Sequence, residues 1–244
     1  MKKIISFSLY GDKKIYLHGA LRNAELASFF YPGWISRFYV GPSVPKSIVQ
    51  DLKSLNSEVL LIDRPENNLS SFWRFFAFAD DDVDIVLVRD TDSRFSQREV
   101  SAVSAWLETG STFHIMRDHP FHSAKIMAGM WGARAVGLRD ILHLIQHASY
   151  DNIYGSDQFF LRKYIYPRCI NDSCVHASYY LYESSAVSFP HKRINGEFVG
   201  ERFDENDIFF HDDRIMLSRY DNSIFLRFFH NFKIKTKGIL IGKN

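Results

Sequence analysis

The stretch DIVLVRDTDSRF, from Asp84 to Phe95, contains the clearest structural signal in the sequence. Its apolar run predicts a buried strand, which ends in two aspartates, Asp90 and Asp92, separated by a single residue. Alternate side chains of an extended segment share a face, so both carboxylates point the same way. Two like charges on one face repel each other. Either a cation lies between them, or they only end the strand and help to begin the next helix.

Short apolar runs alternate with helical stretches along the chain. Strands are predicted over 3–10, 36–40, 58–63 and 83–88, and helices over 19–30, 47–56, 69–79 and 98–110. Further strands are expected over 111–116 and 124–133, and further helices around 138–146 and 157–164. This alternation predicts an α/β domain with a largely parallel sheet covered on both faces, in which ligands bind beyond the carboxyl ends of the strands. We expect one domain over 1–203, followed by a basic, aromatic segment over 204–244.

Composition excludes several classes of protein. The 30 basic and 28 acidic residues nearly balance, which argues against a nucleic-acid-binding protein. The only cysteines are Cys169 and Cys174, which indicates a reducing compartment. No run approaches the roughly 18 apolar residues of a membrane span. We therefore expect a cytoplasmic protein, at most peripheral on the inner face of the cell membrane.

The C-terminal segment supports two interpretations. It interleaves basic residues with Phe225, Phe228, Phe229 and Phe232. These rings either pack onto the domain or form a helix that lies on an anionic membrane surface, where lipid-linked acceptors are found.

A pair of carboxylates at a strand end suits a hard divalent cation such as Mn or Mg. Such a cation binds few protein ligands and completes its coordination with water or substrate phosphates. A metal-bound diphosphate is therefore the expected ligand of Asp90 and Asp92. An enzyme that breaks a sugar-to-diphosphate bond needs this metal to take up the negative charge that develops on the leaving group.

The run SFWRFFAFADDDVDIVLVRDTDSRF, from Ser71 to Phe95, resembles the corresponding region of A-type (GT-A) nucleotide-sugar glycosyltransferases. It especially resembles the retaining family that includes bacterial lipopolysaccharide galactosyltransferases and glycogenin. In that family a helix with an aromatic-Arg pair precedes an apolar strand that ends in Asp-x-Asp. The resemblance implies a Rossmann-like GT-A domain with a mixed, mainly parallel sheet. It also implies that Arg74 lies near the donor phosphates or sugar and that Asp90 and Asp92 bind the metal.

The resemblance continues in two later motifs. KIMAGMWGA looks like the family's glycine-containing strand beside the donor sugar, with Gly129 at the matching place. GSDQFFL is similar to the family's Asp-Gln helix start, which implies that Asp157 and Gln158 lie near the reacting sugar. The remaining residues that we assign to donor binding are Ser6, Ser8, Tyr10 and Arg89.

The sequence departs from the family in two places. Arg89 stands where the family usually has leucine, and the late His-x-x-Gly-x-x-Lys-Pro-Trp element that supplies a third metal ligand has no clear match. His176 or His191 is expected to complete the metal site instead. Lys192 and Arg193 are expected to grip the diphosphate as charge-assisted donors.

The loop FHIMRDHPFH leaves alternatives open. His114, His119 and His122 could hold a zinc ion, which would make the protein a metal-dependent hydrolase. We favour a loop on the acceptor side, where Asp118 or His119 positions or deprotonates an acceptor hydroxyl. A phosphatase of the haloacid-dehalogenase type is disfavoured because three strand-helix units precede Asp-x-Asp, whereas its nucleophile follows the first strand. A non-catalytic sugar-binding domain is the remaining alternative.

The function expected from these motifs is a metal-dependent glycosyltransferase. The donor would be a nucleotide-diphosphate sugar, and no nucleic acid would bind. The resemblance alone implies the acceptor, a growing surface glycan such as lipopolysaccharide or capsule.

Overall fold

A computed structural model describes residues 1–149 and 151–223. The strands are β1 (Lys3–Leu9), β2 (Ile35–Val40), β3 (Glu58–Leu61), β4 (Ile85–Arg89), β5 (Phe113–Arg117), β6 (Met130–Arg134) and β7 (Ser173–Ala177). The α-helices are α1 (Lys14–Phe30), α2 (Lys46–Ser54), α3 (Gln97–Glu108), α4 (Ile141–His147), α5 (Ser156–Phe160), α6 (Tyr166–Cys169) and α7 (His211–Asp221). Two 3₁₀ helices, η1 (Asn68–Ala79) and η2 (Ala135–Leu138), and a π-helical turn, η3 (Leu161–Ile165), complete the described elements.

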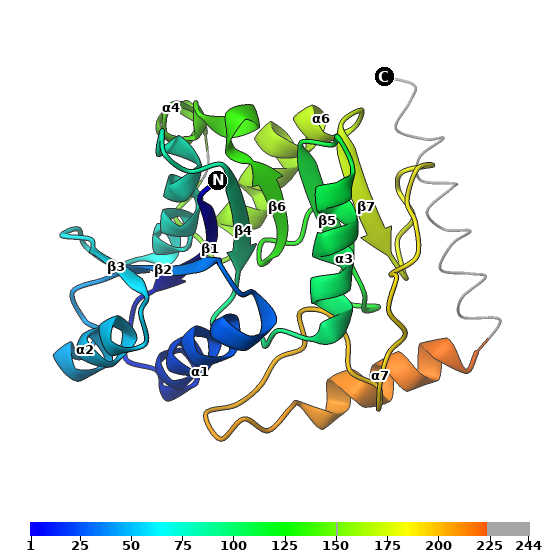
Figure 1. The fold of residues 1–244 in the computed structure, drawn as a ribbon, viewed down its shortest axis with the longest axis horizontal. Helices are drawn as coiled ribbons and strands as arrows, with labels where there is room; N and C mark the ends of the chain where they lie inside the picture. Colours follow the sequence, from blue (N-terminus) through cyan, green and yellow to red (C-terminus); the bar gives the residue numbers. More distant parts are fainter. Residues whose placement is uncertain (150, 224–244) are drawn as a thin grey trace.

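The strands form one sheet in the order β3-β2-β1-β4-β6-β5-β7. Every neighbouring pair is parallel except the two that involve β6, which runs antiparallel between β4 and β5 (Figure 1). The chain leaves β1 toward β2 and β3, and then returns to the other side of β1 with β4. This reversal is the topological switch point, beyond which α/β sheets bind their ligands.

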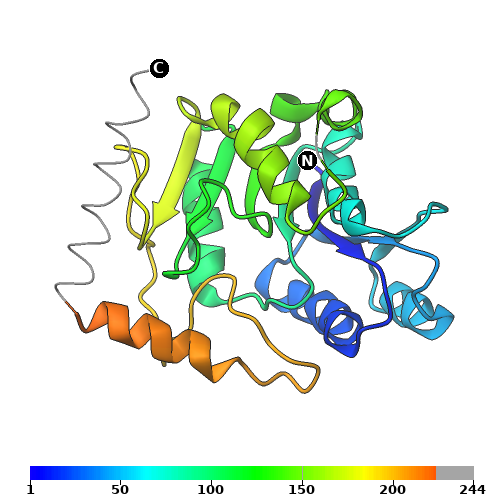
Figure 2. The same cartoon turned by 180° about the vertical axis from the view of Figure 1, so that it is seen from behind.

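Helices cover both faces of the sheet, as the alternation of strands and helices predicts. One face packs on α1, α2 and α3, through a core that includes Phe7, Phe38 and Trp106. The other face packs on η1, α4 and the α5–α6 stretch, through a core that includes Phe75 and Trp131. Figures 1 and 2 show the two helical layers from opposite sides. The predicted single α/β domain with a mixed, mainly parallel sheet is therefore confirmed.

The alternation of side chains along β4 sets the direction of each site residue. Ile85 and Leu87 lie in the core beside α1 and α3, whereas Val86 and Val88 lie in the core beside η1. Arg89 continues the first set, and Asp90 continues the second. The sheet therefore sends Arg89 toward α3 and Asp90 toward η1.

The chain beyond Asp204 packs on the domain for as far as it is described. Leu217 of α7 joins a small core with Tyr179 and Phe198, and α7 lies along the edge of the domain near α3 (Figures 1 and 2). The segment expected from residue 204 therefore begins within the packed domain. Its aromatic part, with Phe225, Phe228, Phe229 and Phe232, lies outside the described residues.

Three elements differ from the sequence prediction. The stretch 69–79 is helical, but as the 3₁₀ helix η1, and the strand expected over 124–133 begins only at Met130. The sheet also gains β7, which the sequence did not predict as a strand. Of the helices described, none has the length and apolar character to cross a membrane.

Candidate functional site

A cleft of about 650 Å³ opens at the carboxyl ends of β1 and β4, beside the start of β6. It brings together nine of the residues predicted for the site from segments far apart in the chain. They are Ser8, Tyr10, Arg74, Asp90, Asp92, His119, Gly129, Asp157 and Gln158.

Hydrogen bonds from α1 and from Arg94 fix the backbone of the Asp-Thr-Asp turn. Asn23 of α1 donates its side-chain amide to the carbonyls of Thr91 and Ser93, at 3.1 and 2.9 Å. The guanidinium of Arg94 donates to the same two carbonyls. α1 approaches so closely at Gly19 that a Cβ there would overlap the Thr91 carbonyl. The two aspartates therefore stand on a preorganised turn.

Neither carboxylate of the pair caps the following helix. Ser96 does so, because its hydroxyl accepts the Glu99 N–H at 3.2 Å. Burial and the neighbouring charge of Asp90 raise the pKa of Asp92 to about 6. Asp92 forms no ion pair within the described residues, whereas Asp90 pairs with Arg74. The donor set fits a divalent cation, which Asp90 and Asp92 would hold together with substrate oxygens.

Arg74 connects this pair to the rest of the cleft. Its backbone is fixed to β1 because its carbonyl accepts from the Ser6 hydroxyl at 2.7 Å and its N–H donates to the Ser8 hydroxyl at 3.0 Å. Its buried guanidinium pairs with the carboxylate of Asp90 and, at 2.8 Å, with that of Asp157. Burial alone would lower the pKa of Arg74, but the charges of the two carboxylates raise it.

Asp157, Gln158 and Gly129 also line the cleft. Asp157 lies in the first turn of α5, and its carboxylate accepts both from Arg74 and from the Gln158 N–H. Gln158 accepts the Ala128 N–H at 3.0 Å and donates to the Ile126 carbonyl, so it holds the chain before β6 in place. A Cβ at Gly129 would overlap the carboxylate of Asp90. Gly129 thus lies against Asp90, and Asp157 and Gln158 are linked to Asp90 through Arg74.

One segment of the cleft was not predicted from the sequence, a strap formed by residues 198–203. Arg202 pairs in an isolated bridge with Ser93, and the Phe203 N–H donates to the Asp92 carbonyl at 2.8 Å. Phe198, Gly200 and Arg202 line the cleft from this strap. The half-exposed guanidinium of Arg202 pairs with Asp213 of α7 at 3.0 Å. Only the run of glycines and charges in NGEFVGER hinted at this segment.

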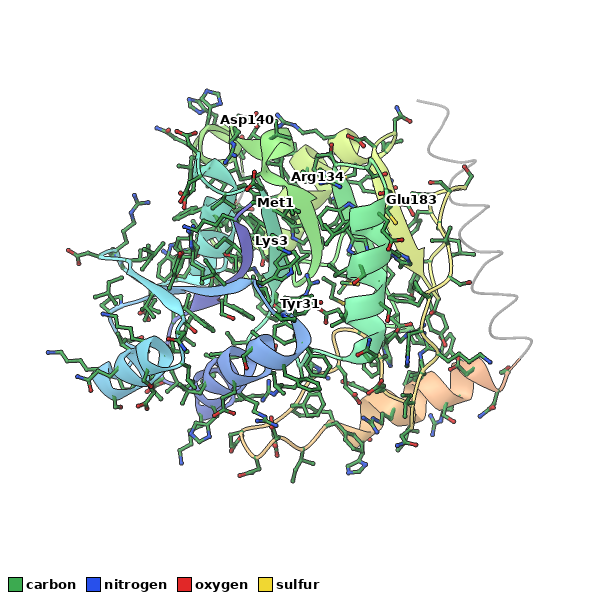
Figure 3. The ribbon with its side chains drawn as sticks, in the orientation of Figure 1. Met1, Lys3, Tyr31, Arg134, Asp140 and Glu183 are labelled. Carbon is green, nitrogen blue, oxygen red and sulfur yellow. The ribbon has the colours of Figure 1, made fainter. Side chains whose placement is uncertain are left out.

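Arg89 and Ser6, both predicted to bind the donor, lie outside the cleft. Arg89 is buried beneath α3, where it donates to Glu99 at 2.7 Å, and Tyr31, labelled in Figure 3, donates to the same carboxylate. The assignment of Arg89 to donor binding is wrong because Arg89 and Asp90 are neighbours on one strand, and their side chains point to opposite faces of the sheet. Ser6 shares the face of Ser8 but lies deeper, where η1 covers its hydroxyl. Ser6 therefore positions Arg74 rather than a ligand.

Asp118 is the centre of a buried ion-pair network behind the cleft. Arg98 and Arg193 both donate to its carboxylate, and so does the Val199 N–H at 3.0 Å. Burial would raise the pKa of Asp118, but the hydrogen bond from Arg98 and the charge of Arg193 lower it. A fully enclosed, doubly paired carboxylate cannot deprotonate an acceptor, so the predicted catalytic role of Asp118 is wrong.

Lys192 and Arg193, the predicted diphosphate ligands, lie outside the cleft, and Arg193 belongs to the Asp118 network. Arg193 also pairs with Asp221 at 2.9 Å, and Lys192 lines a separate hollow beside α7. The carbonyl of His191 accepts from Arg98, and its ring lies outside the cleft. The metal role of His191 and the diphosphate role of Lys192 and Arg193 are therefore not borne out by their positions.

The zinc cluster of the hydrolase alternative does not form. His114 lies on the α3 face of the sheet, stacked on Trp106, and bonds His176 of β7 at 2.9 Å. His119 and His122 lie at the cleft on a different element, so the three predicted ligands are apart. His176 faces α3 too and cannot complete the site at Asp90. Across residues 1–149 and 151–223, no group of three or more His, Cys, Asp or Glu side chains is arranged to hold a metal.

His119 reaches the cleft, but both of its nitrogens are engaged. Nδ1 accepts the Phe121 N–H at 3.1 Å, so Nε2 carries the proton and donates to the Asp213 carbonyl at 2.8 Å. Burial lowers its pKa. His119 is thus a neutral, fully bonded ring, and its predicted role as a base is wrong.

The chain matches no protein-family profile and no curated protein. Two solved structures are similar to it. A glycosyltransferase involved in the glycosylation of the major capsid of PBCV-1 is 17% identical, with a TM-score of 0.48 over 74% of this chain and 84% of that one. Glucosyl-3-phosphoglycerate synthase from Mycobacterium tuberculosis, in complex with Mn²⁺, UDP-glucose and glycerol 3-phosphate, is 13% identical, with a TM-score of 0.46 over 79% and 73%. Both TM-scores lie below 0.5, so the fold described above, a single α/β domain with a mixed, mainly parallel sheet, rests on the strand order and not on these likenesses.

Proposed function

We propose that this protein is a glycosyltransferase that moves a sugar from a nucleotide-diphosphate donor to a hydroxyl group. The observation that carries the proposal is the repelling pair Asp90 and Asp92, which caps no helix and faces a cleft at the switch point of the sheet. In the reaction the bond from the anomeric carbon to the diphosphate oxygen breaks, a bond to the acceptor oxygen forms, and the proton of the acceptor hydroxyl passes to the departing diphosphate.

We assign a separate role in this reaction to each set of charged residues in the cleft. Asp90 and Asp92 would hold Mn or Mg, which supplies positive charge for the leaving diphosphate. Arg202, half exposed at the cleft, is the cation that we propose for the diphosphate in place of Lys192 and Arg193. Asp157 would stabilise the positive charge that develops at the anomeric carbon.

The finer assignments follow from the motif resemblance. We infer a growing surface glycan, lipopolysaccharide or capsule, as the acceptor, and a cytoplasmic protein whose basic C-terminal segment touches the membrane. The second and coarser candidate, a non-catalytic sugar-binding domain, would use the same cleft without turnover.

Nucleotide binding tests the proposal directly. UDP and manganese are the first probes because the mycobacterial structure contains Mn²⁺ and UDP-glucose. At 100 times Kd, a ligand that binds only the folded state adds about 2.7 kcal/mol of stability, or ~5–10 °C in Tm. We expect this rise with UDP and manganese together and a much smaller one with either alone, measured by thermal unfolding. A panel of nucleotide diphosphates that leaves Tm unchanged in manganese would contradict the proposal.

The variant Asp157→Asn separates a transferase from a silent sugar-binding domain. Asparagine keeps the size of the side chain but removes the charge, so we expect kcat to fall by about 100-fold or more while UDP affinity changes little. Rates of donor hydrolysis or transfer, with UDP titrations, measure the two effects. Asp140→Asn is the matched control because Asp140 pairs with Arg168 at the surface, far from the cleft. Normal turnover in Asp157→Asn would remove this residue from the active site.

A further inference from the structure

The cleft has two halves on either side of β4. The switch-point half contains Ser8, Tyr10 and Arg74, at the ends of β1 and η1. The other half lies over β6 and β5, and the loop 118–129 that connects β5 to β6 forms much of its wall. If the nucleotide occupies the switch-point half, as α/β sheets favour, the second half remains for the acceptor.

Four rings form one wall of this second half, which we name the aromatic wall: His119, Phe121, His122 and Phe198. The ring of His119 contacts the rings of both Phe121 and Phe198, with centroids 4.9 and 4.3 Å away. Phe198 is buried, but Phe121 is 56% exposed at the cleft. An exposed apolar ring that lines a cleft and packs on a neighbouring ring is typical of a ligand-binding surface.

His122 adds a directed hydrogen-bond donor to this wall. Its Nδ1 accepts the Asp118 N–H at 3.1 Å, which requires that the proton of the neutral ring sits on Nε2. Burial lowers the pKa of His122 to about 3, so the ring stays neutral. The side chain is more than nine-tenths buried and lines the cleft, and its Nε2–H has no partner within the described part of the chain. A donor that lines a cleft and has no protein partner is available to an acceptor oxygen of a ligand.

The wall is rigid because the Asp118 network fixes both of its loops. The Asp118 N–H orients His122, and its carboxylate accepts the Val199 N–H, next to Phe198. Asp118 is thus a positioning residue for the aromatic wall. Each histidine of the wall accepts a backbone N–H at Nδ1 and is therefore neutral, so the wall carries no charge and suits an uncharged ligand.

We propose that the aromatic wall is the acceptor subsite, where Phe121 stacks on the apolar face of a neutral pyranose ring and His122 donates from Nε2 to one of its hydroxyl oxygens. This inference rests on the proposed function and deepens it by assigning the acceptor a subsite with named residues and by limiting its ring to a neutral sugar. An apolar ring face combined with one oriented donor matches the alternating C–H face and hydroxyl edge of a sugar. His122 acts here by orienting the acceptor, and Phe121 selects its shape.

Binding of simple glycosides tests the subsite apart from catalysis. Methyl α- and β-glycosides of glucose, galactose, mannose and N-acetylglucosamine, with 3-phosphoglycerate as an anionic comparison, are titrated against the full chain by saturation-transfer NMR, with and without UDP and magnesium. We expect at least one glycoside to bind more tightly than 3-phosphoglycerate. Phe121→Ala and His122→Ala are each expected to weaken it by at least tenfold. His122→Gln should recover part of the loss, because its amide can accept from Asp118 and still donate.

Control variants separate the possible failures. Phe29→Ala removes another exposed phenylalanine, 76% exposed on α1 and outside the cleft, and should leave glycoside binding unchanged. The Tm shift with UDP and manganese tests the proposed function and the integrity of each variant separately. A wild-type protein that binds UDP but no glycoside, a preference for 3-phosphoglycerate, or unchanged binding in both alanine variants would overturn the acceptor subsite. If UDP and manganese do not raise the Tm of the wild-type protein, the proposed function itself is overturned.

Discussion

Asp92→Asn is expected to abolish the manganese-dependent stabilisation by UDP while the fold is retained. The asparagine has no charge, and the loss of a direct metal ligand should weaken the metal and its diphosphate by at least about 100-fold, more than the loss of an outer-shell partner. The metal-free protein should not be destabilised, because the substitution removes one member of a repelling pair whose repulsion contributes to the raised pKa of Asp92. Thermal unfolding with UDP and with or without manganese measures both effects.

Asp82→Asn provides the matched control for this variant. Asp82 is a surface carboxylate paired with Lys2, and it does not line the cleft. We expect it to keep the full UDP and manganese shift. An Asp92→Asn protein with wild-type UDP affinity in saturating manganese would show that Asp92 does not bind the metal.

Arg74→Ala is expected to produce the largest loss of stability among the substitutions considered. The substitution leaves two carboxylates, Asp90 and Asp157, without their shared cation, and Asp157 is nearly buried. Removal of one partner from a buried ion pair costs about 3–5 kcal/mol because the remaining charge is uncompensated. Urea unfolding at neutral pH measures the change in the free energy of unfolding.

An exposed pair tests whether burial is the cause of this loss. Arg168 and Asp140 form two hydrogen bonds of 2.8 and 2.7 Å at the surface, so their geometry is as good as that at Arg74. Arg168→Ala is nevertheless expected to cost less than about 1 kcal/mol, because water screens exposed pairs. Equal costs for the two variants would mean that Arg74 serves the site without stabilising the fold.

Local sequence patterns predicted most of the sheet and the core of the site. The apolar run before Asp90 is a strand, and Asp90 and Asp92 stand at its end. The same alternation rule, applied one residue earlier, places Arg89 on the opposite face of the sheet and so excludes it from the cleft. Its assignment failed because nearness in sequence was taken for nearness in space.

The errors in the second half of the site have a common physical cause. Asp118 and His119 carry chemically suitable groups, but Arg98, Arg193 and the chain around Asp213 bind them in pairs that no local pattern reveals. Arg202 was missed for the same reason, since its place in the cleft depends on a pairing with Ser93 more than one hundred residues away. Long-range pairing therefore limited the prediction, rather than the choice of residue types.

The reversed direction of β6 has a consequence for how such a protein can diversify. Because β6 runs antiparallel to β5, the segment 118–129 that joins them begins and ends at the same edge of the sheet, beside the cleft. Substitutions or insertions within 119–127, short of Gly129 and its close approach to Asp90, would remodel the proposed acceptor half without disturbing β1, β4 or the Asp-Thr-Asp turn. Proteins of this fold could therefore change the ligand of that half by replacing one short loop, while β1, β4 and the Asp-Thr-Asp turn stay unchanged.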